Sequence, residues 1–198
     1  MIRNIVFDLG NVLISFRPAE YLEKNKYPPG IREVILTDVF RSPEWLMLDN
    51  GDLTSEEAID LISQKSSLKR EEIAFIFKKR TDIMFPLEKN VRLLSELKKH
   101  GFVLYYLSNF PSDIFDEVKN RYSFFRYFEG GIISADVKLS KPDVRIFKLL
   151  FEKFGINPEE SLYIDDIEYN ARAAEFSGMK ALTTFGSDDI SEKVFASF

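Results

Sequence analysis

The first evidence for the fold is a short stretch near the amino terminus, "IVFDLGNVLISF", residues 5–16. Ile5, Val6 and Phe7 are strand-forming residues, and Gly10-Asn11 breaks the apolar pattern as strand ends do. Asp8 therefore follows a predicted buried strand, at the place where open α/β sheets carry ligand chemistry. An aspartate close to a glycine is also a common turn device. This stretch alone leaves open whether Asp8 is a turn residue or a nucleophile.

The pattern of the chain changes twice after this strand. Residues 17 to about 85 carry helical signals, among them a capping box at Thr54–Glu57, and show no strand pattern. From Pro86 onward, apolar strand patterns alternate with helix patterns. The predicted strands cover 102–110, 131–137, 161–166 and 180–185, and the predicted helices cover 69–83, 87–99, 112–122, 142–155 and 168–177. This alternation implies right-handed crossovers and a parallel sheet.

We therefore predict an α/β fold, a Rossmann-like parallel sheet of about five strands flanked by helices. This core comprises residues 1–14 and 86–198, and an all-helical insertion at residues 15–85 interrupts it. A chain of 198 residues has room for one such domain with a sizeable insertion.

Composition removes several classes of site and partner. The chain contains no cysteine, which excludes disulfides, thiolate metal sites and cysteine nucleophiles. The single histidine, His100, lies between Lys99 and Gly101, where a cation at a helix C-terminus is expected. The net charge of −5 argues against a nucleic-acid partner, and no apolar run approaches the ~18 residues of a membrane helix. The chain enters its first strand without a signal-peptide pattern, so we expect a cytoplasmic protein.

Polar groups follow the ends of several predicted strands. Asp8 ends the first, Ser108-Asn109 the second and Asp165-Asp166 the fourth, and Lys141 lies in a loop after the third. Because the tips of parallel strands meet at one edge of a sheet, we expect these groups to converge. Carboxylates hold Mg²⁺, and a hydroxyl, an amide and a lysine bind phosphate oxygens. The set is therefore suited to handling a phosphoryl group.

These segments resemble the motifs of the haloacid dehalogenase superfamily of phosphotransferases. Within it they look most like the small sugar-1-phosphate phosphatases whose first motif reads aspartate-leucine-glycine-asparagine-valine. The four motifs correspond, in order, to residues 8–13, 107–109, 141–142 and 164–166 with Asn170. The insertion at residues 15–85 is similar to the helical cap of that family. The resemblance implies an Mg²⁺-dependent phosphatase that hydrolyses a small phosphate monoester through an aspartyl-phosphate.

The resemblance also assigns roles to individual residues. Asp8 would be the nucleophile and, with the backbone carbonyl of Gly10 and with Asp166, a Mg²⁺ ligand. Asp165 would support the metal site, and Asn170 would orient it. The groups that hold the phosphoryl oxygens would be Asn11, Ser108, Asn109 and Lys141, of which Lys141 also neutralises charge in the transition state.

One position departs from the family pattern. Most phosphatases of this superfamily carry a general acid two residues after the nucleophile, and Gly10 stands there in this chain. A general acid contributes roughly 10² to 10⁴ in rate, and most for poor leaving groups. We therefore expect either an acidic leaving oxygen, as in an anomeric sugar-1-phosphate, or an acid supplied by the cap or by the substrate.

Residues of the cap are expected to select the substrate, since a cap covers the site and excludes water. The candidates for substrate contacts are Phe16, Arg17, Trp45, Asp49 and Asn50. Core packing is the alternative for Phe16 and Trp45, and a surface position is the alternative for Arg17.

Other interpretations of the same residues stay open at this stage. Ser108-Asn109 fits a turn before Pro111, Lys141 fits a solvated loop lysine, and Asp165-Asp166 fits a helix N-cap. The competing functions are a catalytically silent binding or regulatory protein, a 2-haloacid dehalogenase and another phosphoryl-transfer enzyme. The acid pair argues against the dehalogenase, because two more carboxylates would repel its anionic substrate.

Overall fold

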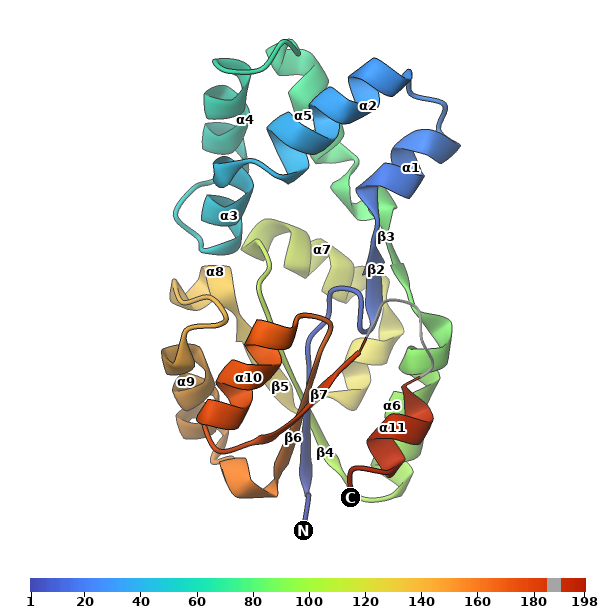
Figure 1. Ribbon diagram of the computed structural model, residues 1–198, viewed down its shortest axis with the longest axis vertical. Helices are drawn as coiled ribbons and strands as arrows, with labels where there is room; N and C mark the ends of the chain where they lie inside the picture. Colours follow the sequence, from blue (N-terminus) through green and yellow to red (C-terminus); the bar gives the residue numbers. More distant parts are fainter. Residues whose placement is uncertain (185–189) are drawn as a thin grey trace.

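A five-stranded parallel sheet forms the centre of the computed structural model, which describes residues 1–184 and 190–198 (Figure 1). The spatial order is β5-β4-β1-β6-β7. The strands are β1 (Asn4–Phe7), β4 (Val103–Ser108), β5 (Gly130–Ile133), β6 (Ser161–Asp165) and β7 (Lys180–Thr183). Val6 of β1 pairs with Tyr105 on one side and with Tyr163 on the other. The chain order reverses across β1, at the kind of switch point where α/β sheets bind ligands. The predicted parallel sheet of about five strands is confirmed.

Helices cover both faces of this sheet. Phe7 joins an apolar cluster with α6 (Glu88–Lys99), α7 (Ser112–Arg121) and α11 (Ser191–Phe195). Its neighbour Val6 points to the opposite face and joins a second cluster with α9 (Val144–Phe154) and α10 (Glu168–Phe176). A strand that is buried on both faces has to be apolar throughout, which explains the continuous apolar run of β1.

The inserted segment is built from short helices around an apolar cluster of its own. The helices are α1 (Pro18–Lys24), α2 (Pro29–Ile35), α3 (Pro43–Asp49), α4 (Ser55–Ser63) and α5 (Arg70–Lys78), with a π-helical segment at Leu36–Phe40 and a 3₁₀ helix at Arg80–Ile83. Trp45, Ile62 and Ile73 belong to this cluster. The predicted capping box opens α4, with reciprocal hydrogen bonds between Thr54 and Glu57. The helices lie beyond the carboxyl edge of the sheet (Figure 1).

Two short strands join the insertion to the rest of the chain. β2 (Ile14–Phe16) and β3 (Met84–Pro86) pair antiparallel, and Ile14 lies opposite Pro86. The expectation that residues 15–85 contain only helix is wrong at both ends of that range. Strands of three residues are too short to show the period-two pattern from which strands are predicted, and these two exist because they pair with each other.

Other elements differ from their predicted bounds. The strand predicted at 131–137 ends at Ile133, and α8 (Ser134–Val137) follows it, because the buried Ser134 hydroxyl bonds backbone groups of other segments. The helix predicted at 69–83 divides into α5 and the 3₁₀ helix Arg80–Ile83. Residue 185, the last of the predicted strand 180–185, lies outside the described residues. Further 3₁₀ helices occupy Ser123–Tyr127 and Pro158–Glu160.

No helix in the described part of the chain combines the length and the apolar composition that a membrane span needs. The division into a core of residues 1–14 and 86–198 and a cap of residues 15–85 stays a prediction.

Candidate active site at the carboxyl edge of the sheet

The polar strand ends meet in one pocket at the carboxyl edge of the sheet. Asp8 follows β1 directly, Ser108 ends β4 and Asp165 ends β6. Asp166 follows β6, and Lys141 lies in the loop between α8 and α9. Oxygens of Asp8, Asp165 and Asp166 lie within 4.8 Å of one another. The convergence that a parallel sheet implies is therefore present.

The two oxygens of the Asp8 carboxylate have different surroundings. Oδ1 accepts a hydrogen bond from Ser108 Oγ at 2.7 Å and lies 2.9 Å from Lys141 Nζ. Oδ2 makes no hydrogen bond to the described residues and lies beside Gly10, whose added Cβ would stand 3.8 Å away. Asp8 is only 6 % exposed, so the hydroxyl and the ammonium fix a buried carboxylate and leave one oxygen free for chemistry.

Lys141 links two of the three aspartates. Its Nζ lies 2.7 Å from Asp165 and 2.8 Å from the Tyr163 hydroxyl, besides its contact with Asp8. Burial alone lowers the pKa of Lys141, but the two carboxylates outweigh it and raise that pKa above its usual value. The lysine therefore stays charged. The interpretation of Lys141 as a solvated loop lysine is wrong, because the side chain is buried at the centre of the site.

Asp165 and Asp166 have different roles in the structure although they are adjacent. The buried Asp165 carboxylate accepts hydrogen bonds from Tyr163, from the backbone N–H of Ile167 and from Asn170. Burial raises its pKa, but Lys141 and these donors outweigh burial, and the net pKa is lowered. Asp166 is partly exposed to the pocket, and burial followed by the Asp165 charge raises its pKa. Asp165 thus holds the lysine, while Asp166 faces the pocket.

The asparagines make contacts other than the expected phosphate contacts. Asn11, at a positive φ of 51°, donates its backbone N–H to Ile14 O at 2.7 Å. Its side chain bridges Asp166 and the backbone N–H of Phe16. Asn109 exchanges two hydrogen bonds with the Lys141 backbone, at 2.9 and 3.0 Å. In this arrangement the side chains of both asparagines position other residues of the site, and their predicted contacts with phosphoryl oxygens stay predictions.

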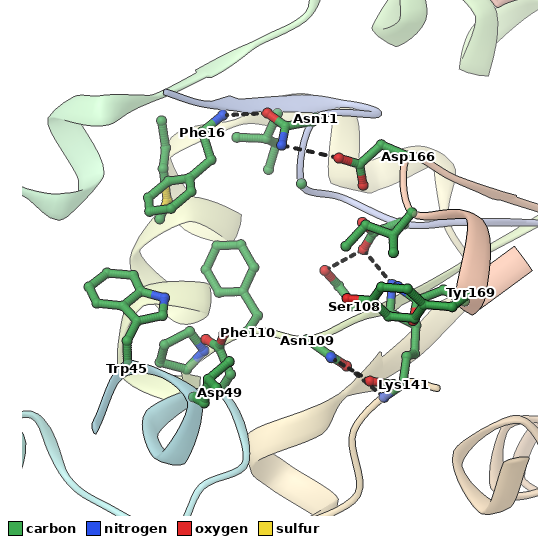
Figure 2. A pocket seen from close by; sticks show the side chains of 18 residues that line it. Asn11, Phe16, Trp45, Asp49, Ser108, Asn109, Phe110, Lys141, Asp166 and Tyr169 are labelled. Carbon is green, nitrogen blue, oxygen red and sulfur yellow. Dashed lines mark hydrogen bonds and ion pairs between the residues drawn. The ribbon is translucent and has the colours of Figure 1, made fainter. Parts of the chain in front are cut away.

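A cavity of about 250 Å³ connects this cluster to the helical insertion (Figure 2). One side is polar and carries Ser108, Lys141 and Asp166. The opposite side is mainly apolar. It carries Phe16, Trp45 and Phe110, and the other apolar lining residues of the cavity are Ile14, Leu46, Met84, Pro111 and Ile167. Asp49 lies among these apolar groups, beside Trp45 and Phe110 in Figure 2.

The four substrate-contact candidates other than Asp49 separate into three groups. Phe16 and Trp45 line the cavity and also pack together, with ring centroids 5.7 Å apart, so they combine both predicted roles. Arg17 lies in a neighbouring hollow and pairs with Glu20 at 3.1 Å, which supports the surface interpretation. Asn50 uses its side-chain oxygen to accept a hydrogen bond from Ser140.

Sequence analysis missed Tyr163, which donates a hydrogen bond to Asp165 and contacts Lys141 Nζ. The available signal was the spacing of two residues in "SLYIDD", which places Tyr163 and Asp165 on the same face of β6.

The residues at the edge fit a divalent cation. Asp8, Asp165 and Asp166 bring three carboxylates against one lysine, and burial raises the pKa of Asp8 to about 7, with Lys141 opposing this effect and Asp165 adding to it. A buried side-chain oxygen of Asn170 also has no hydrogen-bond partner among the described residues. Mg²⁺ prefers hard oxygen ligands such as carboxylates, and here three carboxylates outnumber the single positive charge of the lysine. Of the three aspartates, Asp8 and Asp166 line the pocket and would hold the ion.

Comparison with known proteins gives the same family. Residues 2–178 match the family model of haloacid dehalogenase-like hydrolases. A sesquiterpene phosphatase from Aspergillus oryzae is 24 % identical, over 89 % of this chain and 87 % of its own. A phosphoglycolate phosphatase from Mannheimia succiniciproducens is also 24 % identical, over 92 % and 85 % of the two chains.

Solved structures share the architecture. A haloacid dehalogenase family enzyme from Bacteroides thetaiotaomicron, solved in complex with magnesium and inorganic phosphate, is 28 % identical and superposes with a TM-score of 0.76 over 98 % of this chain and 99 % of its own. Together with the buried aspartate cluster, the family match over nearly the whole chain leads to one conclusion: this protein belongs to the haloacid dehalogenase-like hydrolases.

Proposed function

We propose that this hydrolase is an Mg²⁺-dependent phosphatase that hydrolyses a small phosphate monoester through an aspartyl-phosphate on Asp8. The observation that carries the proposal is the asymmetry of the Asp8 carboxylate. Ser108 and Lys141 fix one oxygen, and the other has no partner among the described residues. The magnesium and phosphate bound to the structural relative from Bacteroides thetaiotaomicron support the same chemistry.

Each group in the proposal belongs to a residue already placed at the sheet edge. Asp8 attacks phosphorus, and Ser108 and Lys141 stabilise the charge on the phosphoryl oxygens. Asp8, Asp166 and the backbone carbonyl of Gly10 would hold the ion. Bound Mg²⁺ supplies positive charge that offsets the phosphoryl oxygens. Asp165, Tyr163, Asn109, Asn11 and Asn170 position these groups through the contacts described above.

The cavity constrains the alcohol part of the substrate. Its lining opposite the aspartates is apolar and aromatic, with Phe16, Trp45 and Phe110. Aromatic faces bind the apolar face of a ring, and no lysine or arginine other than Lys141 lines the cavity among the described residues. An alcohol without a second anionic group fits this lining. A sugar-1-phosphate meets this requirement and stays our prediction for the substrate.

The experiment that tests this function compares the wild type with Asp8→Asn on p-nitrophenyl phosphate and on a panel of phosphate esters, with Mg²⁺ and with a chelator. We expect turnover that requires both Mg²⁺ and Asp8, and a loss of at least ~10³ in the variant, since it lacks the nucleophile. Glucose-1-phosphate should be hydrolysed faster than glucose-6-phosphate if an acidic leaving oxygen is required.

Two results would contradict the proposal. Absence of Asp8-dependent turnover across the panel would favour a silent binding or regulatory protein. Chloride release from 2-chloropropionate in the presence of the chelator would favour a dehalogenase.

A further inference from the structure

The cavity contains one acid that has no place in the chemistry assigned so far. Its titratable lining residues are Asp8, Asp49, Lys141, Asp166 and Tyr169. Asp8, Lys141 and Asp166 belong to the nucleophile and metal site, and the Tyr169 side chain is mostly exposed, at 58 %. Asp49 stands apart from them, on the insertion. Gly10 supplies no acid, so the group that protonates a leaving oxygen has to come from elsewhere.

The position of Asp49 matches the direction in which a leaving group departs. In phosphoryl transfer the attacking and leaving oxygens lie roughly in line with phosphorus. A phosphate attacked by Asp8 therefore directs its leaving oxygen away from the sheet and toward the insertion. Asp49 is the last residue of α3, and it lies across the cavity from Asp166 (Figure 2).

The loop that follows Asp49 is fixed against the sheet domain. The carbonyl of Asp49 accepts a hydrogen bond from Ser134, and the Asn50 side chain accepts one from Ser140. Gly51 has a φ of 73°, and a Cβ there would stand 2.3 Å from Ala135 O. The two hydrogen bonds and the close backbone packing at Gly51 hold the end of α3 at a defined place over the cavity.

The surroundings of Asp49 favour the protonated carboxyl. Burial raises its pKa to about 8, the Arg80 charge opposes this effect, and the Asp8 charge adds to it. Arg80 acts from the 3₁₀ helix Arg80–Ile83, where it pairs with Asp113 at 3.2 Å. Asp49 forms no ion pair among the described residues. The carboxyl therefore carries a proton near neutral pH.

We infer that Asp49 is the proton donor and acceptor of this enzyme, acting from the cap in place of the side chain missing at Gly10. The inference rests on the proposed phosphatase function. In the first step the Asp49 proton passes to the leaving oxygen as its bond to phosphorus breaks and the bond from Asp8 to phosphorus forms. In the second step the Asp49 carboxylate takes a proton from the attacking water as the Asp8–phosphorus bond breaks, which restores both side chains.

The test compares two substrates of nearly equal shape, phenyl phosphate and p-nitrophenyl phosphate, whose leaving groups differ in acidity. For Asp49→Asn we expect kcat/KM for phenyl phosphate to fall by a factor of about 10² to 10⁴. The factor by which kcat/KM for p-nitrophenyl phosphate falls should be smaller by about tenfold or more, because nitrophenolate leaves without a proton. With p-nitrophenyl phosphate the variant should show a burst of nitrophenolate, since water attack becomes slow. The matched control is Asp52→Asn, which changes an exposed acid three residues further along the chain. It should leave kcat/KM for both substrates unchanged.

A rescue variant and the pH profile of the wild type extend the test, and the pH profile still tests the inference if Asp49→Asn folds poorly. An added Cβ at Gly10 meets only Asp8 Oδ2, at an ordinary 3.8 Å, so Gly10→Asp has room for a side chain. We expect Gly10→Asp to restore hydrolysis of phenyl phosphate in the Asp49→Asn background. In the wild type, kcat/KM for phenyl phosphate should decline above about pH 8, where Asp49 loses its proton.

The possible outcomes separate the inference from the function beneath it. If the wild type shows no turnover that depends on Asp8, the phosphatase proposal itself fails. If that turnover is present and Asp49→Asn lowers kcat/KM equally for both substrates, or not at all, only the role of Asp49 is overturned.

Discussion

At the residue scale, Asp49 couples the stability of the protein to pH. Its pKa rises from 3.8 to about 8 on folding, mainly through burial. Between these values the native state holds more protons than the unfolded state, so this group makes the free energy of unfolding fall as pH rises. Asp49→Asn removes that dependence. We expect the variant to gain stability relative to the wild type between about pH 5 and about pH 8.5, as measured by urea unfolding at both pH values. A difference in the free energy of unfolding between variant and wild type that is the same at both pH values would contradict this prediction.

Single residues also show where sequence reasoning succeeds and where it stops. The convergence of Asp8 and Asp165 was predictable because parallel strand tips share one edge, and Lys141 was expected there because its loop follows the third predicted strand. The partner of Asn109 was not predictable, since it depends on the path of the loop that carries Lys141. Tyr163 was missed because a tyrosine within an apolar strand is also typical of a core.

At the scale of elements, the turn after α3 should be sensitive to substitution. Gly51→Ala places a Cβ 2.3 Å from Ala135 O at a positive φ of 73°. The backbone strain alone costs about 1–2 kcal/mol, and relief of the clash requires this end of α3 to move away from the sheet domain. We expect a lower free energy of unfolding and a lower kcat/KM.

Gly30→Ala is the matched control for this substitution. Gly30 lies in α2, its added Cβ would meet nothing within 4 Å, and alanine favours the helix by about 0.5–1 kcal/mol. Thermal unfolding and kinetics of both variants check the pair. If both glycine substitutions change the free energy of unfolding and kcat/KM equally, the close approach at Gly51 does not contribute to stability or to activity.

The elements themselves were predictable in proportion to their length. The α4 capping box and the alternation after residue 86 gave helices and strands close to those observed. The three-residue strands β2 and β3 escaped prediction because their pairing joins residues about 70 positions apart and leaves no local pattern. The five-residue α11 was also not predicted.

At the scale of the whole molecule, the insertion forms hydrogen bonds to the segments that flank the sheet at two places among the described residues. One is the loop after α3, on Ser134 and Ser140. The other is α7, where Arg121 donates to Thr81 O at 2.9 Å. The cavity between the two parts therefore takes its polar side from the strand ends and its apolar side mainly from the insertion and its connectors. The proposed nucleophile and metal ligands thus come from the strand ends, whereas the proposed proton donor Asp49 and much of the apolar lining come from the insertion.

Mg²⁺ should stabilise the whole fold, because the cluster that binds it draws on both ends of the sequence. Asp8 and Asp166 are brought together only when β1 and β6 pair, so an ion held by both binds the native state and not the unfolded chain. At a concentration of 100 times its dissociation constant such an ion adds about 2.7 kcal/mol to the free energy of unfolding. Thermal unfolding with Mg²⁺ and with a chelator measures this gain without any substrate. We expect Asp166→Asn to lose most of it and the exposed Asp52→Asn to keep it. The same gain in the wild type and in Asp166→Asn would mean that the ion binds elsewhere, and the metal site proposed at the sheet edge would have to be abandoned.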